Sequence, residues 1–155
     1  MRPYVMYLFL IYCSLMIQAV FFQGAKPDIV MVLVCIFTLK YGQLRGVALG
    51  AIAGLIIDTA NGFILGPNIM SKAVVAFLTG TIEDTLYQRN AFINAMVVTI
   101  LCVVDIFLIY ISLETFSTAS FLNRSWEISF MQVIYTLIAS IVLYPLLTGP
   151  GKIKI

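Results

Sequence analysis

The segment GQLRGVALGAIAGLIIDTANGFILG, residues 42–66, decides the fold because it joins an apolar stretch to a regular series of glycines. Glycines occupy positions 42, 46, 50, 54, 62 and 66, and the four-residue spacing is broken at Asp58. In a water-exposed helix each glycine costs about 1 kcal/mol relative to alanine. In a bilayer the same series is useful, because small residues four apart let two helix backbones approach closely.

The composition predicts an integral membrane protein. Hydrophobic residues make up 62% of the chain and charged residues only 10%, whereas soluble domains carry roughly 25% charged residues. Mean hydropathy is +1.06. The alternative, a globular protein with buried core helices, is disfavoured because no polar residues are left over to cover such a core. The 155 residues therefore form a single polytopic membrane domain, residues 1–155.

Long uninterrupted apolar runs favour helices over the alternating pattern of a membrane barrel. We expect an all-α integral membrane protein with six transmembrane helices. Three runs are close to the roughly 20 residues needed to cross a bilayer: residues 5–22, 92–113 and 128–147. Three shorter uncharged runs, at 29–39, 47–57 and 73–82, cross only by including charged residues at their ends, where lysine side chains can reach the headgroups.

Basic residues in the connecting loops predict the orientation. With a cytoplasmic N-terminus, six of them lie inside (Arg2, Lys40, Arg45, Arg89, Lys152, Lys154) and three outside (Lys26, Lys72, Arg124). The positive-inside rule then places both termini in the cytoplasm. A basic residue before an apolar run is also typical of a signal peptide, but the first run is long and lacks a convincing cleavage site, so we interpret it as a retained anchor.

The glycines fall into two groups. Gly46, Gly50 and Gly54 share one face of the third segment, called the glycine face below, and form a groove for helix packing. Packing within the chain's own bundle is favoured over docking of a partner's transmembrane helix, although the two do not exclude each other. Gly62 and Gly66 lie among turn-forming residues, so we expect the chain to turn there and re-enter the membrane near residue 69.

Three charged residues lie within or beside the apolar segments. By the topology above, Asp58, Lys72 and Asp105 all lie in the outer half of the membrane. Charged side chains in lipid cost a few kcal/mol and tend to face the bundle and pair. We therefore predict a buried charge network in which Lys72 neutralises Asp58, Asp105 or both and joins the third, fourth and fifth segments. The alternative is that each group reaches headgroups and water separately.

Catalytic chemistry finds little support. Histidine is absent, which removes the usual base of a Ser or Cys nucleophile and the commonest metal ligand. Asp58 and Asp105 form the one candidate pair for an intramembrane aspartic hydrolase, but their flanking residues match no such enzyme. The three cysteines are widely spaced within apolar runs and indicate no metal site. We expect no catalytic residues, no metal, no cofactor and no nucleic-acid binding.

The segment PDIVMVLVCIFTLKYGQLRGVALGAIAGLIIDTANGFILGPNIMSKAVVAFLTG, residues 27–80, resembles the MreD family of the bacterial cell-elongation machinery. The resemblance is loose over the whole chain and closest in this segment. It rests on an apolar helix opened by Pro-Asp, a basic residue and glycine at its end, a glycine-stepped helix that ends in an aspartate, and later glycines. The residues concerned are Pro27, Asp28, Lys40, Gly42, Asp58, Gly62, Gly66 and Gly80.

The resemblance implies a non-catalytic membrane component of the elongation machinery, in the bacterial cytoplasmic (inner) membrane. It implies binding to MreC through the membrane, association with RodA and a class B penicillin-binding transpeptidase, and support of cell shape and lateral peptidoglycan synthesis. The polar segment at residues 83–89 is either a solvated loop or a contact for MreB. The family also resembles the substrate-binding subunits of energy-coupling-factor transporters. The runner-up function is therefore a solute-binding membrane subunit, with Asp28, Asp58, Lys72 and Asp105 lining an outer cavity.

Overall fold

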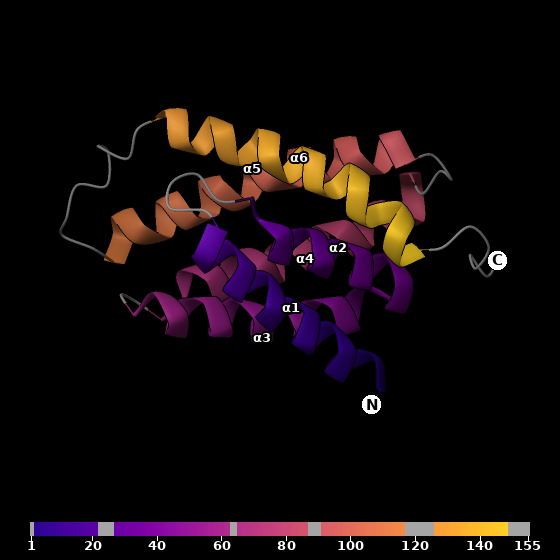
Figure 1. Ribbon diagram of the computed structural model, residues 1–155, viewed down its shortest axis with the longest axis horizontal. Coiled ribbons are helices and arrows are strands. Elements are labelled where there is room, and N and C mark those ends of the chain that lie inside the picture. Colours follow the sequence, from indigo (N-terminus) through magenta and orange to yellow (C-terminus); the bar gives the residue numbers. More distant parts are fainter. Residues whose placement is uncertain (1, 22–26, 63–64, 87–90, 117–125, 149–155) are drawn as a thin grey trace.

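The computed structural model describes residues 2–21, 27–62, 65–86, 91–116 and 126–148, and the described residues form α-helices and no strand (Figure 1). The helices are α1 (Arg2–Phe21), α2 (Ile29–Tyr41), α3 (Gln43–Asn61), α4 (Pro67–Leu86), α5 (Ala91–Phe116) and α6 (Trp126–Thr148). Each of the six predicted apolar runs lies in one of these helices, apart from residue 22, which falls outside the described residues, and the all-α prediction is confirmed. Lys26, Arg89, Arg124, Lys152 and Lys154, on which part of the predicted orientation depends, lie outside the described residues, as does part of the polar segment at 83–89.

Helix α2 lies at the centre of the fold. It contacts each of the other five helices, and all residues from 30 to 38 are buried. In Figure 1, α5 and α6 run together along one side of the molecule and α1 and α3 along the other, with α2 between them. A helix that is hydrophobic all round is expected to be buried on every side. This explains why so short a helix has almost no polar residue.

Both ends of α2 are defined by particular residues. At the start, the Asp28 carboxylate accepts a hydrogen bond from the Met31 backbone N–H at 2.9 Å, which satisfies one of the unpaired donors of the first turn. At the other end Gly42 adopts φ 91° and its N–H donates to the Thr38 carbonyl at 2.8 Å. Glycine adopts this backbone conformation at no steric cost. The single residue Gly42 thus separates α2 from α3, and the two helices fold back on each other.

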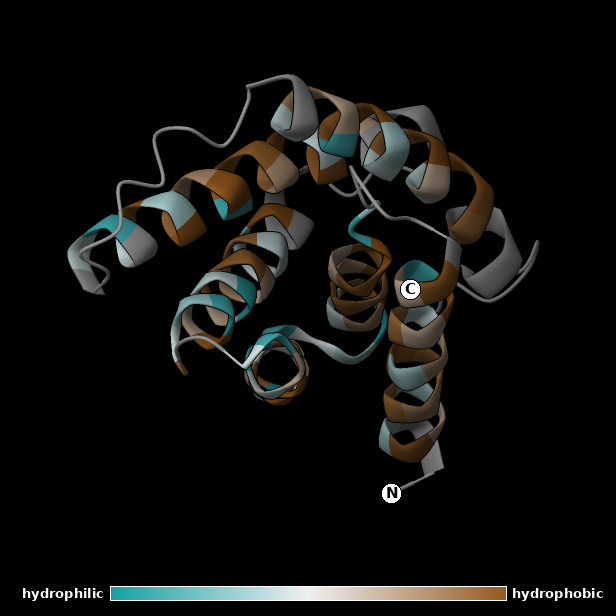
Figure 2. Ribbon diagram, turned by 60° about the vertical axis from the view of Figure 1, so that its left-hand side comes forward, coloured by the Kyte–Doolittle hydropathy of each residue, from teal (hydrophilic) through white to brown (hydrophobic). Residues whose placement is uncertain are grey.

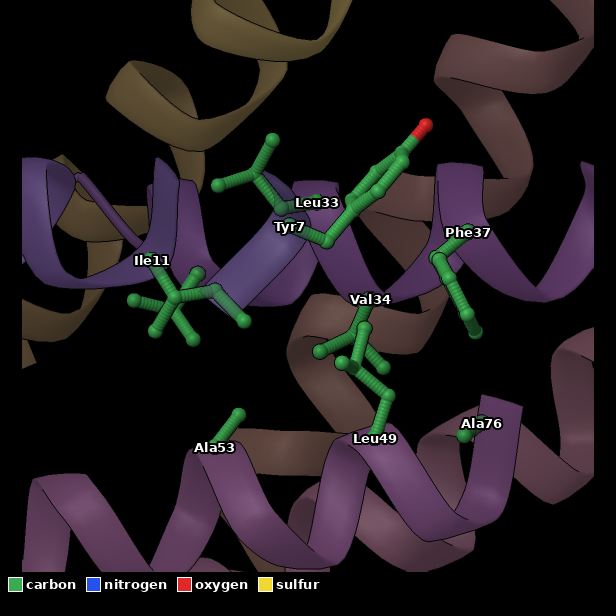
Figure 3. Packing of buried hydrophobic residues seen from close by; sticks show 9 residues of the cluster. Tyr7, Ile11, Leu33, Val34, Phe37, Leu49, Ala53 and Ala76 are labelled. Carbon is green, nitrogen blue, oxygen red and sulfur yellow. The ribbon is translucent and has the colours of Figure 1, made fainter. Parts of the chain in front are cut away.

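The apolar core between α1, α2 and α3 is aromatic at one end. Tyr7 of α1 packs edge-on against Phe37 of α2, with ring centroids 4.9 Å apart. Figure 3 shows these residues with Ile11, Val34 and Leu49, which continue the core toward α3. Edge-to-face aromatic pairs add about 0.5–1.5 kcal/mol beyond the burial of their area. The N-terminal helix is therefore attached to the bundle by ordinary apolar packing.

The outward surface is also apolar. Large hydrophobic side chains are exposed along the outer faces of the helices, among them Phe9 of α1, Phe107 of α5 and Phe130 of α6, each about two-thirds exposed. Figure 2 shows hydrophobic residues distributed along the helices. Exposed apolar surface on this scale is unusual for a protein surrounded by water. The apolar outer surface agrees with the high content of hydrophobic residues in the sequence.

Among the described residues, α3 (Gln43–Asn61) is the one helix that is both long and apolar enough to cross a membrane. Shorter apolar helical stretches cover Tyr4–Val20, Ile29–Tyr41, Met96–Ser112 and Ser129–Leu143. Helix α4 begins at Pro67, before the predicted uncharged run at 73–82, and includes Lys72 in its second turn. The helix starts earlier than the hydropathy pattern indicates because its first turn and Lys72 both find buried polar partners.

Candidate functional site

A cluster of three charged side chains lies inside the bundle. The Lys72 ammonium of α4 contacts Asp28 Oδ2 and lies 2.6 Å from Asp105 Oδ2 of α5. Lys72 is 1% exposed and Asp105 is fully buried, while the Asp28 side chain is 12% exposed. We call Asp28, Lys72 and Asp105 the ion triad. It joins the start of α2 to α4 and α5.

Local hydrogen bonds hold Asp28 in position. Its backbone N–H donates to Thr136 Oγ1 of α6 at 3.0 Å, and the Thr136 hydroxyl in turn donates to the Gln132 carbonyl at 2.7 Å. The same residue caps α2 through its side chain. Asp28 therefore serves both as a helix cap and as a partner of Lys72, and α6 is tied to the same point.

The geometry explains how these charges are tolerated. Removing an ion from water costs several kcal/mol, which is offset only when a close partner and further hydrogen bonds are present. Here the ammonium lies between two carboxylates from different helices. Breaking such a buried pair by removing one partner typically costs about 3–5 kcal/mol. The ion triad thus fixes the relative positions of α2, α4 and α5.

Asp58 lies apart from the ion triad. Its Oδ2 accepts hydrogen bonds from the backbone N–H groups of Gly66 at 2.9 Å and Ile69 at 3.2 Å. Its Oδ1 accepts bonds from the Asn68 backbone N–H at 3.2 Å and the Asn68 side-chain amide at 2.7 Å. The three backbone N–H groups are unpaired donors at the start of α4, where the helix dipole favours negative charge. A carboxylate at the end of α3 therefore caps the next helix.

The placement of Asp58 changes one part of the prediction. We expected Lys72 to neutralise Asp58, Asp105 or both; within the described ranges Lys72 pairs with Asp105, which was one of these alternatives, and with Asp28 in place of Asp58. The Asp58 oxygens are occupied by four donors from the start of α4. The third helix is therefore joined to the fourth by a cap. In the charge network, Asp28 at the start of α2 takes the place that was predicted for Asp58 of α3.

The glycine face packs mainly against α4. A Cβ atom at Gly50 would lie 2.6 Å from the Lys72 carbonyl oxygen, and one at Gly54 would lie 2.5 Å from the Ile69 Cα. Gly46 instead faces the Thr38 side chain of α2. Separations this short do not occur for real Cβ atoms, so the helix backbones touch directly at these points. The face is used inside the chain's own bundle, which is the favoured alternative of the sequence analysis.

The opposite end of the α3–α4 pair is closed by Gln43. Its side-chain amide donates to the Phe77 carbonyl and to Thr81 Oγ1, both at 2.9 Å. Gly80 gives the necessary room, because a Cβ there would lie 2.9 Å from the Gln43 Cα. The pair is thus clamped by Asp58 at one end and by Gln43 at the other. Gln43 was not among the residues predicted from the sequence, although a glutamine four residues before the predicted apolar run at 47–57 was a usable signal.

The remaining motif glycines are turn residues, as their neighbours indicated. Gly62 ends α3 in the left-handed conformation, with φ 69°, and its N–H donates to the Asp58 carbonyl at 3.1 Å. Gly66 has φ 132° and presents its N–H to the Asp58 side chain. Pro27 is buried directly before Asp28. Pro27, Gly62 and Gly66 therefore lie beside Asp28 or Asp58, whereas Gly42 and Gly80 lie at the Gln43 end of the α3–α4 pair.

The cysteines and the aspartates Asp58 and Asp105 are the groups that were considered for metal or hydrolytic chemistry. No group of three or more His, Cys, Asp or Glu side chains among them is placed to hold a metal ion. Cys13, Cys35 and Cys102 are free thiols. The two aspartates considered as a hydrolase pair, Asp58 and Asp105, are bound to different partners at different places. The contacts of these two aspartates hold helices in position.

The fold and the ion triad define a helical protein of the membrane class, with an apolar outer surface and a cluster of charged side chains inside the bundle. The chain matches the family described as rod shape-determining protein MreD over residues 2–149, and it belongs to that family. This is a family of membrane proteins that determine rod shape. Neither the curated proteins nor the solved structures contain a match to the chain.

Proposed function

We propose that the protein is a non-catalytic scaffold of the cell-elongation machinery in the bacterial cytoplasmic membrane. It binds MreC through the membrane and, with RodA and a class B penicillin-binding transpeptidase, supports cell-shape control and lateral peptidoglycan synthesis. MreB is a possible inner partner. The family match over residues 2–149 carries this proposal. The internal use of the charged groups supports it, since they hold helices together.

The proposed topology has six membrane crossings with both termini in the cytoplasm and a fold like that of energy-coupling-factor substrate-binding subunits. Successive crossings would bring the start of α2, the start of α4 and the outer half of α5 to one level, and the residues of the ion triad come from these places. Lys72, which the loop analysis counted as an outer basic residue, is buried. When Lys72 is no longer counted among the outer loop residues, the excess of basic residues on the inner side becomes larger.

A partner helix must then use a surface other than the glycine face, because Gly50 and Gly54 already contact the α4 backbone. The outer faces of α1, α5 and α6 remain, and all are apolar. Association of helices in lipid depends on packing between such faces. We therefore place the MreC contact on an outward face of the bundle.

The alternative function, capture of a solute, has weaker support. It requires polar groups that converge on an outer cavity and are free to bind a ligand. Asp28, Lys72 and Asp105 bind one another, and Asp58 is fully engaged by the start of α4. The four groups on which that function depended therefore have partners inside the chain.

Purification of the tagged full-length chain from native membranes in mild detergent, with mass spectrometry of the co-purifying proteins, tests the proposal. The expected result is enrichment of MreC and of the RodA and transpeptidase pair. A matched control is the chain with Gly54→Leu, which should lose folded protein and therefore all specific partners together. Co-purification of an ATPase-bearing transport module in place of MreC would overturn the proposal and favour solute capture.

A further inference from the structure

The charges of the ion triad do not balance. Two carboxylates, Asp28 and Asp105, face one ammonium, Lys72. If both carboxylates are ionised, the cluster holds one excess negative charge at a place where Lys72 and Asp105 are at most 1% exposed. An uncompensated buried charge costs several kcal/mol, in protein or in lipid. A further group must therefore neutralise the excess negative charge of the ion triad.

Among the described residues, the groups next to the ion triad do not supply the missing positive charge. The titratable groups that face the triad are the thiols of Cys35 on α2 and Cys102 on α5, and neither carries positive charge. Helix α6 contributes the Thr136 hydroxyl, which accepts a hydrogen bond from the Asp28 backbone N–H, and the α3 residue Gly50 contacts the main chain of Lys72 and Ala73. Throughout the part of the chain that the structure describes, Lys72 is the one cation paired with these carboxylates.

The hydrogen bonds show where a neutralising group would bind. Both Oδ2 atoms contact Lys72, and Asp28 Oδ1 accepts the Met31 N–H. Asp105 Oδ1 is buried without a hydrogen-bond partner. The Ser71 hydroxyl interacts with the Asp105 carboxyl group, but its hydrogen bond goes to the Asn68 carbonyl at 3.3 Å. One carboxylate oxygen is therefore free.

We infer that Asp105 binds a proton at Oδ1, so that the triad is neutral and serves as a proton-binding site in the bundle. One proton from water converts the carboxylate to a carboxylic acid, and the positive charge of that proton cancels the excess. The adjacent Ser71 hydroxyl retains lone pairs that can accept a hydrogen bond from the new O–H. A hard metal cation would need six or more oxygen ligands, and the site offers one free oxygen.

Proton binding at this position links the fold to pH. In the unfolded chain Asp105 is exposed and ionised at neutral pH, so the folded chain holds one proton more. Stability therefore falls as pH rises, with a slope that approaches a tenfold change in the folding equilibrium per pH unit for one proton. Releasing the proton would leave net negative charge between α2, α4 and α5 and would loosen their contact.

Infrared spectroscopy of the purified chain in detergent at neutral pH tests the inference directly. The wild type should show one protonated carboxylic acid band, and Asp105→Asn should remove it. Asp28→Asn should remove it too, since Asp105 is then the sole counter-ion of Lys72 and ionises. Absence of the band in the wild type, or its persistence in either variant, would overturn the inference.

Two further measurements keep the test decisive. Asp58→Asn is the matched control, because Asp58 is equally buried but fully hydrogen-bonded, and it should leave the band unchanged. Titration of the wild-type band needs no variant: the band should disappear as pH rises, whether the salt is sodium or choline chloride. Disappearance on adding sodium at constant pH would show a metal-ion site instead. All of these use the isolated chain, so they succeed or fail independently of partner binding.

Discussion

Asp58 and Asp105 are both buried carboxylates, yet the fold neutralises them in different ways. Asp58 is surrounded by neutral donors that lie eight to eleven residues later in the chain. Asp105 depends on Lys72, 33 residues away on another helix. The first arrangement is local and needs one turn of the correct shape. The second forms only once α2, α4 and α5 are in place, so it reports on the whole bundle.

The largest effect is expected at the long-range site. Lys72→Met leaves two buried carboxylates without their cation and should lower the free energy of unfolding by about 3–5 kcal/mol, the usual loss when one partner of a buried pair is removed. Denaturant titration in detergent micelles measures it. Lys40→Met is the control, because Lys40 is exposed and should be replaceable. Equal stability of the two variants would contradict a structural role for the ion triad.

Overpacking of the glycine face should come next. Gly54→Leu places a side chain against the α4 backbone near Asn68 and Ile69, and should cost about 2–3 kcal/mol, in the upper part of the range for overpacked sites. It would also pull the start of α4 away from Asp58. Ala48→Leu, an exposed position on the same helix, is the control. The measurement is the folded fraction by size-exclusion chromatography, and a normal Gly54→Leu profile would show that α3 and α4 are less closely packed.

The local site should give a smaller loss. In Asp58→Asn one oxygen becomes an NH₂ group facing N–H donors, so two of the four hydrogen bonds disappear. The expected cost is about 1–2 kcal/mol, measured as the midpoint of unfolding in the same titration. A loss as large as that of Lys72→Met would mean that Asp58 also holds helices far from α4.

The smallest expected effect is the deviation from additivity in double variants, and it distinguishes the two sites most directly. The losses of Lys72→Met and Asp58→Asn should add within about 0.5 kcal/mol, since the two residues share no partner. Those of Lys72→Met and Asp105→Asn should fall short of additivity by more than that, because the two side chains are in contact. Additive behaviour in both double variants would refute the ion pair.

Much of the fold follows from the sequence because the hydropathy pattern directly indicates where the helices lie. The six apolar runs predicted the six helices, and the glycines at 62 and 66 predicted turns by their neighbours. The fourth helix begins at Pro67, close to the predicted re-entry near residue 69, although the uncharged part of its apolar run starts only after Lys72. Hydropathy treats Lys72 as a charge to be kept at the headgroups, whereas the fold surrounds it with partners.

Asp105 was predicted as a partner of Lys72, but its second partner, Asp28, was not. Asp28 and Asp58 both lie at helix ends on the same side of the predicted membrane. Sequence position alone therefore gives the depth of each side chain in the membrane, but not the direction in which it points around the helix axis. That direction depends on how α2 and α3 pack. Asp58 faces the start of α4 because Gly54 brings the two backbones together. Asp28 is then the carboxylate left to meet Lys72.

The contacts of Gly50 and Gly54 also set limits on how the sequence can change over evolutionary time. Both residues touch backbone atoms of α4, namely those of Asn68, Ile69 and Lys72. Every amino acid supplies the same backbone atoms, so this contact makes no demand on the side chains of α4. It does require the absence of a side chain on α3. Homologous chains should therefore retain small residues at positions 50 and 54 while the outward residues of α4 vary freely.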